Sequence, residues 1–176
     1  MPKKIKVLLT PESITDAIQY LQNYGNELSR KAAELAEKLA NIGYNVSFGI
    51  LADHIYSGET ISSLSVLQTS PTRFEVVAGS VALLFLEFGA GINGVGHELA
   101  GQFGMGAGTY PGQTHAFDPQ GWWYPTDDPN LAVYTSKKTG QMYGHSYGDP
   151  PYKPMYQASV EIRQNIEKAA KEVFRK

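Results

Sequence analysis

The sequence contains no cysteine, which excludes disulfide bonds and thiolate metal sites. It also lacks a long hydrophobic run. The longest, Val81–Leu86, ends at Glu87 and is far shorter than the roughly 20 apolar residues that cross a bilayer. Neither sign of charge dominates, because 15 basic residues face 17 acidic ones. We therefore expect neither a membrane partner nor specific nucleic-acid binding.

The amino terminus is basic and then apolar, as the start of a signal peptide is. Pro11 and Glu12, however, end the apolar run too early for such a peptide. The length of 176 residues fits one domain, residues 1–176, with a substantial core. We expect a soluble, unexported protein.

The first part of the chain predicts a strand at Lys3–Leu9 and then a long helix. Thr10 suits the N-cap and Pro11 the first helical position. Apolar residues then recur at steps of three and four, with Gly25 at the one missing position. They are Ile14, Ile18, Leu21, Leu28, Ala32, Leu35, Leu39 and Ile42. We expect this helix to end at Gly43 and to lie across a sheet, and a coiled coil is the alternative.

After Gly43 the apolar period changes to two, which predicts a strand over Tyr44–Ile50. Leu64 and Val66 indicate another strand. Phe74–Ala78 and Val81–Phe88 are expected to be strands joined by a tight turn at residues 79–80. Strands with such short connections pair antiparallel.

Residues 89–130 have almost no periodicity and are rich in glycine, proline and aromatic residues. A loop this long is usually functional or ordered by a partner. A second hairpin is expected from residues 132–136 and 141–147. Pro154 begins a closing helix with an apolar face of Met155, Ala158, Ile162, Ile166, Ala169 and Val173. The predicted fold is α/β of the α+β type, an antiparallel sheet packed by a long N-terminal helix and a C-terminal helix.

Residues 89–94 spell G-x-G-x-x-G, the glycine pattern of dinucleotide-binding turns. Such a turn must open a helix, join parallel strands and precede an acidic strand end. Here more glycines follow, the preceding strand is expected to end a hairpin, and Asp118 lies in a turn-forming FDPQG segment. We expect no cofactor, and Gly91 and Gly94 to permit unusual backbone angles.

The histidines, at positions 54, 97, 115 and 145, lack the spacing of a helical metal site. The serines lack a G-x-S-x-G elbow. We therefore expect no metal site and no catalytic residue.

Glu87 ends an apolar segment, and its role is open. It could be an acid with a raised pKa, a structural carboxylate that accepts loop amides, or the partner of a charge on another chain. Trp122, Trp123 and Tyr124 stand in a polar loop, where adjacent aromatics indicate a docking surface or a carbohydrate platform.

Four segments resemble one family, the gene-product-ten-like minor structural proteins of long-tailed bacteriophages, also called tail-component or tail-completion proteins. The segments are KIKVLLTPESITDAIQYL, FLEFGAGI, GQFGMGAGTYPGQTHAFDPQGWWY and KPMYQASVEIRQNIEKAAKEVF, and they span nearly the whole chain in order. The EFGAG motif and the proline-led last helix are the most specific parts. The chain departs from the family in its long insert between EFGAG and the second hairpin.

The resemblance implies a virion protein without enzymatic activity, made in the bacterial cytoplasm and located at the head–tail junction. It implies a homo-oligomeric ring, commonly a hexamer, which contacts the tail tube or its terminator and head-completion proteins. DNA would pass through the lumen of such a ring without specific binding. Glu87, Phe88 and Gly89 carry over as the signature, with no catalytic role.

The first hypothesis is therefore a head–tail joining protein. Its candidate interface residues are Glu87, Phe88, Gly89, Gly91, Trp122, Trp123 and Tyr124. The alternative is a cell-wall or carbohydrate-directed hydrolase or binding protein that uses Glu87, His97, His115 and the Trp122–Trp123 loop. A minor capsid protein facing the head interior is a third, weaker reading.

Overall fold

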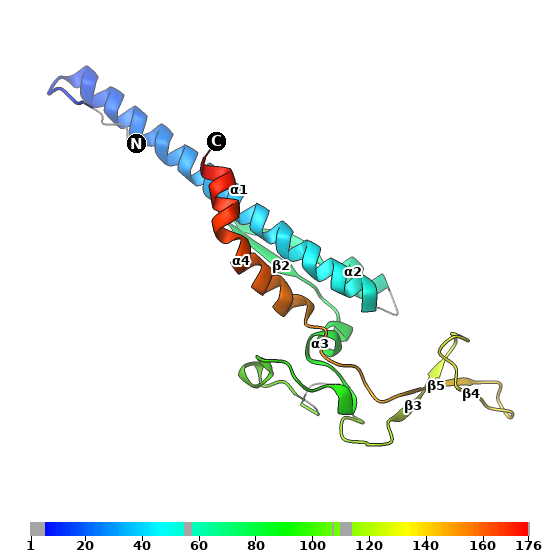
Figure 1. The fold of residues 1–176 in the computed structure, drawn as a ribbon. Coiled ribbons are helices and arrows are strands. Elements are labelled where there is room, and N and C mark those ends of the chain that lie inside the picture. The colour runs from blue at the N-terminus through cyan, green and yellow to red at the C-terminus, as the bar shows by residue number, and fades with distance from the viewer. Residues whose placement is uncertain (1–5, 55–57, 107, 110–113, 176) are drawn as a thin grey trace.

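The computed structural model describes residues 6–54, 58–106, 108–109 and 114–175. The molecule is elongated (Figure 1). Two helices and a β-hairpin form one end, and the glycine- and aromatic-rich segment forms the other. The fold is of the predicted α+β type, with antiparallel strands and long N- and C-terminal helices.

Helix α1 (Pro11–His54) begins where the sequence predicts. Thr10 caps it, because its hydroxyl accepts the Ser13 N–H at 3.3 Å. Gly25 does not interrupt the helix, which at 44 residues is about 66 Å long. The strand expected just before it is absent at residues 6–9, and residues 3–5 lie outside the described part.

The predicted end of this helix at Gly43, and the strand at Tyr44–Ile50, are wrong, because α1 continues to His54. Gly43 is a packing residue and not a helix end. A Cβ atom there would lie 2.7 Å from Ile162 Cδ1 and 3.4 Å from Val76 Cγ2. The absence of a side chain lets α1 approach its neighbours closely.

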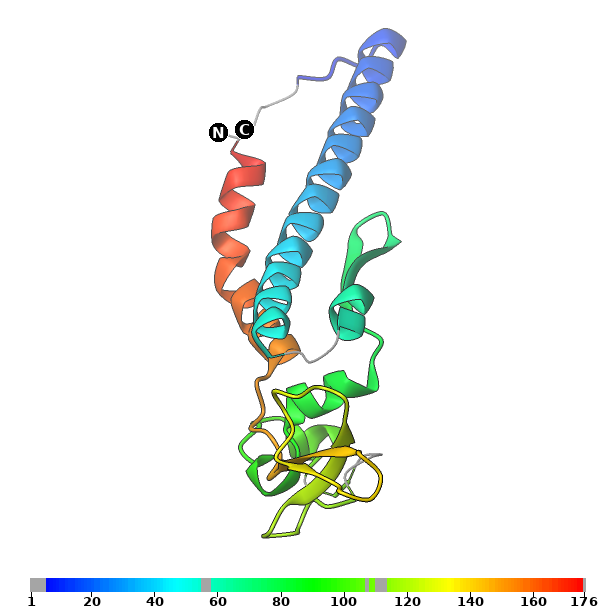
Figure 2. The ribbon, with the colours of Figure 1, turned by 90° about the vertical axis from the view of Figure 1, so that its right-hand side faces the viewer.

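Helix α4 (Pro154–Phe174) runs antiparallel to α1 and begins at the predicted proline. The Ser47 hydroxyl donates to the Pro154 carbonyl at 3.2 Å. At the other end of α4, Glu172 pairs with Lys38. Helix α1 extends well beyond this end, as Figures 1 and 2 show, and every residue from 18 to 30 is exposed.

A short helix, α2 (Gly58–Ser63), leads into a hairpin of β1 (Ser65–Ser70) and β2 (Arg73–Val77). The strands pair antiparallel, with Val66 opposite Val76. The strands predicted near Val66 and at Phe74–Ala78 are thus confirmed. The hairpin contacts α1, and Figure 2 shows α4 and the hairpin on different sides of that helix.

The segment Val81–Phe88 is a helix, α3, so the predicted strand and the turn at Gly79-Ser80 are wrong. Ser80 is the N-cap, and its hydroxyl accepts the Ala82 N–H at 3.2 Å. The segment has no polar residue before Glu87, and such a run does not distinguish a strand from a buried helix.

The described part of the predicted loop, residues 89–130, has more structure than expected. It contains two 3₁₀ turns, Gly91–Asn93 and Ala100–Phe103, and a strand, β3 (Trp122–Thr126). The predicted second hairpin is confirmed as β4 (Tyr134–Thr135) and β5 (Met142–Ser146).

The three strands form an antiparallel sheet in the order β3-β5-β4, separate from the β1–β2 hairpin. Among the described residues, no helix is both long and apolar enough to cross a membrane.

Candidate functional site

The Glu87 carboxylate caps the start of helix α4. Its Oε2 accepts the Met155 N–H at 2.8 Å, and its Oε1 accepts the Tyr156 N–H at 3.0 Å. Helix starts leave such amides without partners inside the helix, and they attract negative charge. Lys153, the N-cap residue, makes no side-chain cap of its own. The Glu87 carboxylate on α3 therefore caps the start of α4 in place of an N-cap side chain.

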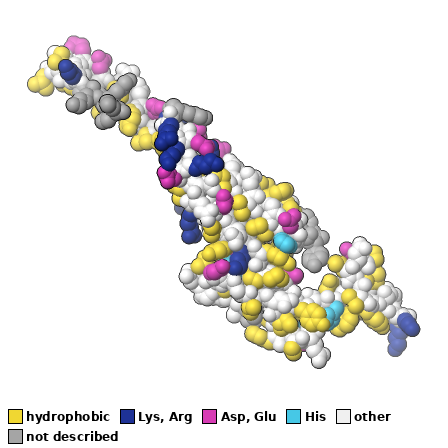
Figure 3. Space-filling view, in the orientation of Figure 1, with side chains coloured by type: hydrophobic (Ala, Val, Ile, Leu, Met, Phe, Trp, Pro, Cys, Tyr) yellow, Lys and Arg dark blue, Asp and Glu magenta, His cyan; other side chains and the backbone are white. Residues whose placement is uncertain are grey.

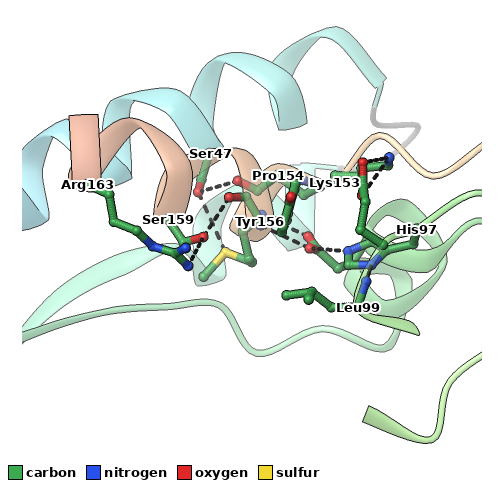
Figure 4. A network of polar contacts seen from close by, with 11 residues as sticks. Ser47, His97, Leu99, Lys153, Pro154, Tyr156, Ser159 and Arg163 are labelled. Carbon is green, nitrogen blue, oxygen red and sulfur yellow. Dashed lines mark hydrogen bonds and ion pairs between the residues drawn. The ribbon is translucent and has the colours of Figure 1, made fainter. Parts of the chain in front are cut away.

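His97 completes this buried site. Its Nε2 lies 3.1 Å from Glu87 Oε1, and its Nδ1 accepts the Leu99 N–H at 3.0 Å. The neutral tautomer with hydrogen on Nε2 satisfies both bonds. The His97 side chain is 2% exposed and that of Glu87 is 10% exposed. Figure 4 shows His97 and Tyr156 meeting at the start of α4.

Two further contacts hold the same helix start. Ser47 reaches the Pro154 carbonyl from α1, as Figure 4 shows. The ammonium of Lys153 donates to both carboxylate oxygens of Glu98, at 3.0 and 2.9 Å. This hydrogen bond is the main cause that holds the pKa of Glu98 below its ordinary value. Segments from α1, α3 and the glycine loop thus converge on one point.

A hollow of about 340 Å³ opens beside the pair, and its lining includes Glu87, Phe88, His97 and Phe103. A general base or nucleophile needs a lone pair that is free to accept a proton or attack a substrate. Both carboxylate oxygens of Glu87 and both ring nitrogens of His97 already take part in hydrogen bonds. The arrangement is suited to holding segments together.

The G-x-G-x-x-G segment is a packing junction. Gly89 and Gly91 have φ angles of 82° and 61°. A Cβ on Gly89 would lie 2.9 Å from the Asp149 carbonyl oxygen, and one on Gly91 would lie 2.6 Å from that of Tyr147. The segment follows a helix and runs into a 3₁₀ turn of three residues. These glycines allow two backbone segments to touch.

Strand alternation separates the three adjacent aromatic residues. Trp122 and Tyr124 are half-buried, and Trp123 between them is 56% exposed. Trp122 lies against Gly91 and stacks on His115 with ring centroids 5.8 Å apart. Trp123 meets the edge of His145 at 4.6 Å. In the predicted aromatic cluster, therefore, the Trp123 ring is exposed, whereas Trp122 and Tyr124 are half-buried.

Trp123 stands between two hollows on the sheet. One, of about 480 Å³, includes Tyr134 and Tyr143, and the other, of about 850 Å³, includes Asp118 and Tyr147. Val133, Tyr134 and Tyr147 are each at least half exposed. This end of the molecule thus carries a broad aromatic surface, and Figure 3 shows hydrophobic side chains there and on α1.

The candidate residues fall into two places. Glu87 and His97 meet at the start of α4, whereas His115 lies on Trp122 in the aromatic segment. Glu87, Phe88, Gly89 and Gly91 are buried within the chain. Across the described residues, no three His, Asp or Glu side chains are placed to hold a metal ion.

Sequence reasoning missed the partners of Glu87. Met155 and Tyr156 bind through backbone amides, which leave no mark in a sequence pattern. The one available signal was Pro154, which marks a helix start but supplies no capping side chain. Because Lys153 supplies no side-chain cap, the amides at the start of α4 can be capped from elsewhere in the chain.

Comparison of the chain with protein-family models, with curated proteins and with solved structures found no match.

Proposed function

We propose that this chain is a structural protein of a long-tailed bacteriophage virion. In this proposal it forms a ring at the head–tail junction and joins the tail tube to head-completion proteins. The observation that carries the proposal is the position of the exposed large apolar side chains, most of which lie toward the two ends of an elongated molecule. The family resemblance of the sequence supports the same function independently.

The first apolar surface is the projecting part of α1, where Ile18 and Leu21 are 51% and 59% exposed. The second is the aromatic surface around Trp123, at the opposite end in Figure 1. Exposed apolar surface of this kind marks interaction sites, and aromatic residues contribute most to binding. A subunit with different contact surfaces at its two ends suits a ring, whose interfaces join unlike patches.

The site at the start of α4 has a supporting part in this proposal. The Glu87 and His97 contacts link the helical end to the glycine loop that leads to the aromatic surface. If the two ends of each subunit keep a fixed orientation, the same rotation relates every copy to the next, and the copies can close into a ring. The hexamer expected from the resemblance remains part of the proposal.

A phage that encodes this chain provides the test. Deleting the gene should yield separate heads and tails, and supplying the protein in trans should restore joined particles. Purified particles should contain the chain by mass spectrometry. Normal joined particles from the deletion phage would contradict the proposed function.

A separate enzyme assay tests the hydrolase alternative. Purified protein and its Glu87→Gln variant are assayed for release of soluble fragments from cell walls. We expect no turnover from either protein, because both oxygens of Glu87 and both ring nitrogens of His97 already form hydrogen bonds within the fold. Turnover that the Glu87→Gln variant loses would favour the enzyme.

A further inference from the structure

The first five turns of α1 project from the molecule. Residues 11–30, here called the projecting segment, extend beyond the C-terminal end of α4. At that end the ammonium group of Lys31 on α1 lies over the Phe174 ring, 5.9 Å from its centroid. The row of apolar residues found in the sequence continues along this segment. Its members Ile14, Ile18, Leu21 and Leu28 are 42 to 59% exposed. A helix with an uncovered apolar row is stabilised by a partner that covers it.

Gly25 lies within this row, and the described part of the chain gives no packing reason for it. Among the residues that the structure describes, no atom would lie within 4 Å of a Cβ at Gly25, and its φ angle is not positive. Glycine in a helix interior costs about 0.5–1 kcal/mol relative to alanine. Gly43, in the same helix, shows what such a residue does when a neighbour is present, because it admits the side chain of Ile162. By the same logic, Gly25 leaves room for a neighbour.

An apolar groove of about 490 Å³ lies between β2 and α4, and Leu39 of α1 contributes to its lining. The other lining residues include Phe74, Val76, Ala158 and Ile162, with Arg73 among them. Leu39 belongs to the same row as Leu21 and Leu28. The chain thus carries an uncovered apolar row and an unfilled apolar groove.

We propose that the projecting segment of one copy docks in this groove of a second copy. The inference rests on the proposed function, since it names the contact by which neighbouring copies would associate. The segment cannot fill its own groove, because α1 is one continuous helix whose start points away from the residues, Ala36 onwards, that line it. The groove of another copy is therefore the matching site, and this contact is head-to-tail.

Charge supports the pairing. The projecting segment has three acidic residues, Glu12, Asp16 and Glu27, against one basic residue, Arg30, and so carries a formal net charge of −2. Arg73 is the charged residue among those that line the groove, and its guanidinium also contacts Glu75 at 2.8 Å. Opposite charges at the margins of an apolar contact favour the correct partner and orientation. Two projecting segments placed side by side would instead bring together two surfaces of the same net charge.

The absence of cysteine makes cross-linking a clean test. A Leu21→Cys variant is mixed with a Thr72→Cys variant, whose cysteine lies in the groove lining, and treated with a flexible bis-maleimide. The control mixture replaces Thr72→Cys by Gly49→Cys, on an open face of α1. The inference predicts cross-linked dimers from the first mixture and none above background from the control.

Sedimentation velocity of the full chain measures association directly. Leu21→Asp and Gly25→Leu should each weaken self-association by more than about tenfold, because they place a charge or a bulky side chain at the contact. Gly49→Leu should leave it unchanged. Circular dichroism of each variant checks that α1 is intact, and Gly25→Leu should preserve it, since leucine favours helix more than glycine does.

The outcomes separate this inference from the proposed function. If the wild-type protein associates but Gly25→Leu associates equally, or if only Leu21→Cys copies cross-link to each other, the docking is overturned and a ring built on other contacts stands. If the wild-type protein remains monomeric at every concentration, the docking is overturned as well. The phenotype of the gene deletion then decides the proposed function by itself.

Discussion

At the scale of single residues, Glu87 joins helix α3 to the start of helix α4 and to His97. Its carboxylate accepts hydrogen bonds from the Met155 and Tyr156 amides and faces His97, all in a buried setting. Of the roles that the sequence left open for it, the geometry favours that of a structural carboxylate. The sequence offered the capture of loop amides as one of three possible roles. The amides belong instead to a helix start 68 and 69 residues further along the chain, which the sequence did not indicate.

Glu87→Gln should destabilise the fold by about 2–3 kcal/mol. Glutamine has one acceptor oxygen, and its NH₂ group would face N–H donors that the carboxylate now satisfies. Chemical denaturation measures the change. Glu37→Gln, at an exposed position on α1, should alter the free energy of unfolding by less than about 0.5 kcal/mol. Equal small effects in both variants would show that the cap contributes little.

Lys153 combines an ion pair with backbone strain, since it has the one positive φ angle, 61°, among the described residues other than glycine. Lys153→Ala loses the ion pair and keeps the strain, whereas Lys153→Gly loses the ion pair and relieves it. The glycine variant should be more stable than the alanine variant by about 0.5–1 kcal/mol. Thermal unfolding of the two variants provides the comparison, and a less stable glycine variant would refute this account of the strain.

Glu98 should make stability depend on pH in the acid range. Its pKa in the folded protein is lowered, chiefly by the hydrogen bond from Lys153. A carboxyl group whose pKa is lowered by folding stabilises the fold at pH values above its ordinary pKa. This contribution is lost as the pH falls through the lowered pKa of the folded state. Carboxyl titration by NMR should show the Glu98 pKa rise when Lys153 is replaced by methionine. An unchanged pKa in that variant would show that the ion pair does not form.

The elements show where sequence patterns succeed. The start of α1, the start of α4, the β1–β2 strands and the β4–β5 hairpin follow from capping, proline and alternation signals. The C-terminal part of α1 was missed because its buried face consists of Ala40, Gly43, Ser47 and Leu51. These residues are mostly small, so their helical spacing gives no hydrophobic signal. The alternation of larger residues over 44–50 was the stronger pattern, and it predicted a strand.

The seam between α1 and α4 should tolerate no side chain larger than alanine at Gly43. Gly43→Leu should destabilise the protein by about 2 kcal/mol or more, because the side chain would enter the space held by Ile162 and Val76. Gly49→Leu is the matched control, as a Cβ there meets nothing within 4 Å. It should be neutral or stabilising, since leucine favours helix. Urea denaturation distinguishes the two, and equal effects would contradict the close packing.

Strand β3, inside the predicted loop, and helix α3, just before it, were harder to predict. Strand β3 contains Pro125, which argues against a strand in the middle of a sheet. Because β3 pairs only with β5 and lies at an edge, proline is tolerated there. Apart from Glu87, helix α3 consists of apolar residues, so the spacing of its apolar residues does not distinguish a helix from a strand. In both cases tertiary contacts decide the structure.

At the scale of the whole molecule, the sequence predicted the class of fold but not its division into two sheets at separate ends. The expected single sheet under the helices is a two-stranded hairpin, and the remaining strands form the aromatic end. This separation depends on the contacts between Glu87 and the backbone amides at the start of α4. Backbone contacts of this kind cannot be predicted from a sequence pattern. It produces an elongated subunit with an apolar helix at one end and an aromatic sheet at the other.

The most direct measurement of the proposed function is electron cryo-microscopy of the head–tail junction in a phage that encodes this chain. We expect a ring of density into which the chain fits, with neighbouring copies in contact and the aromatic end against another virion protein. A junction in which every ring is filled by other chains, with no density of this fold, would contradict the account.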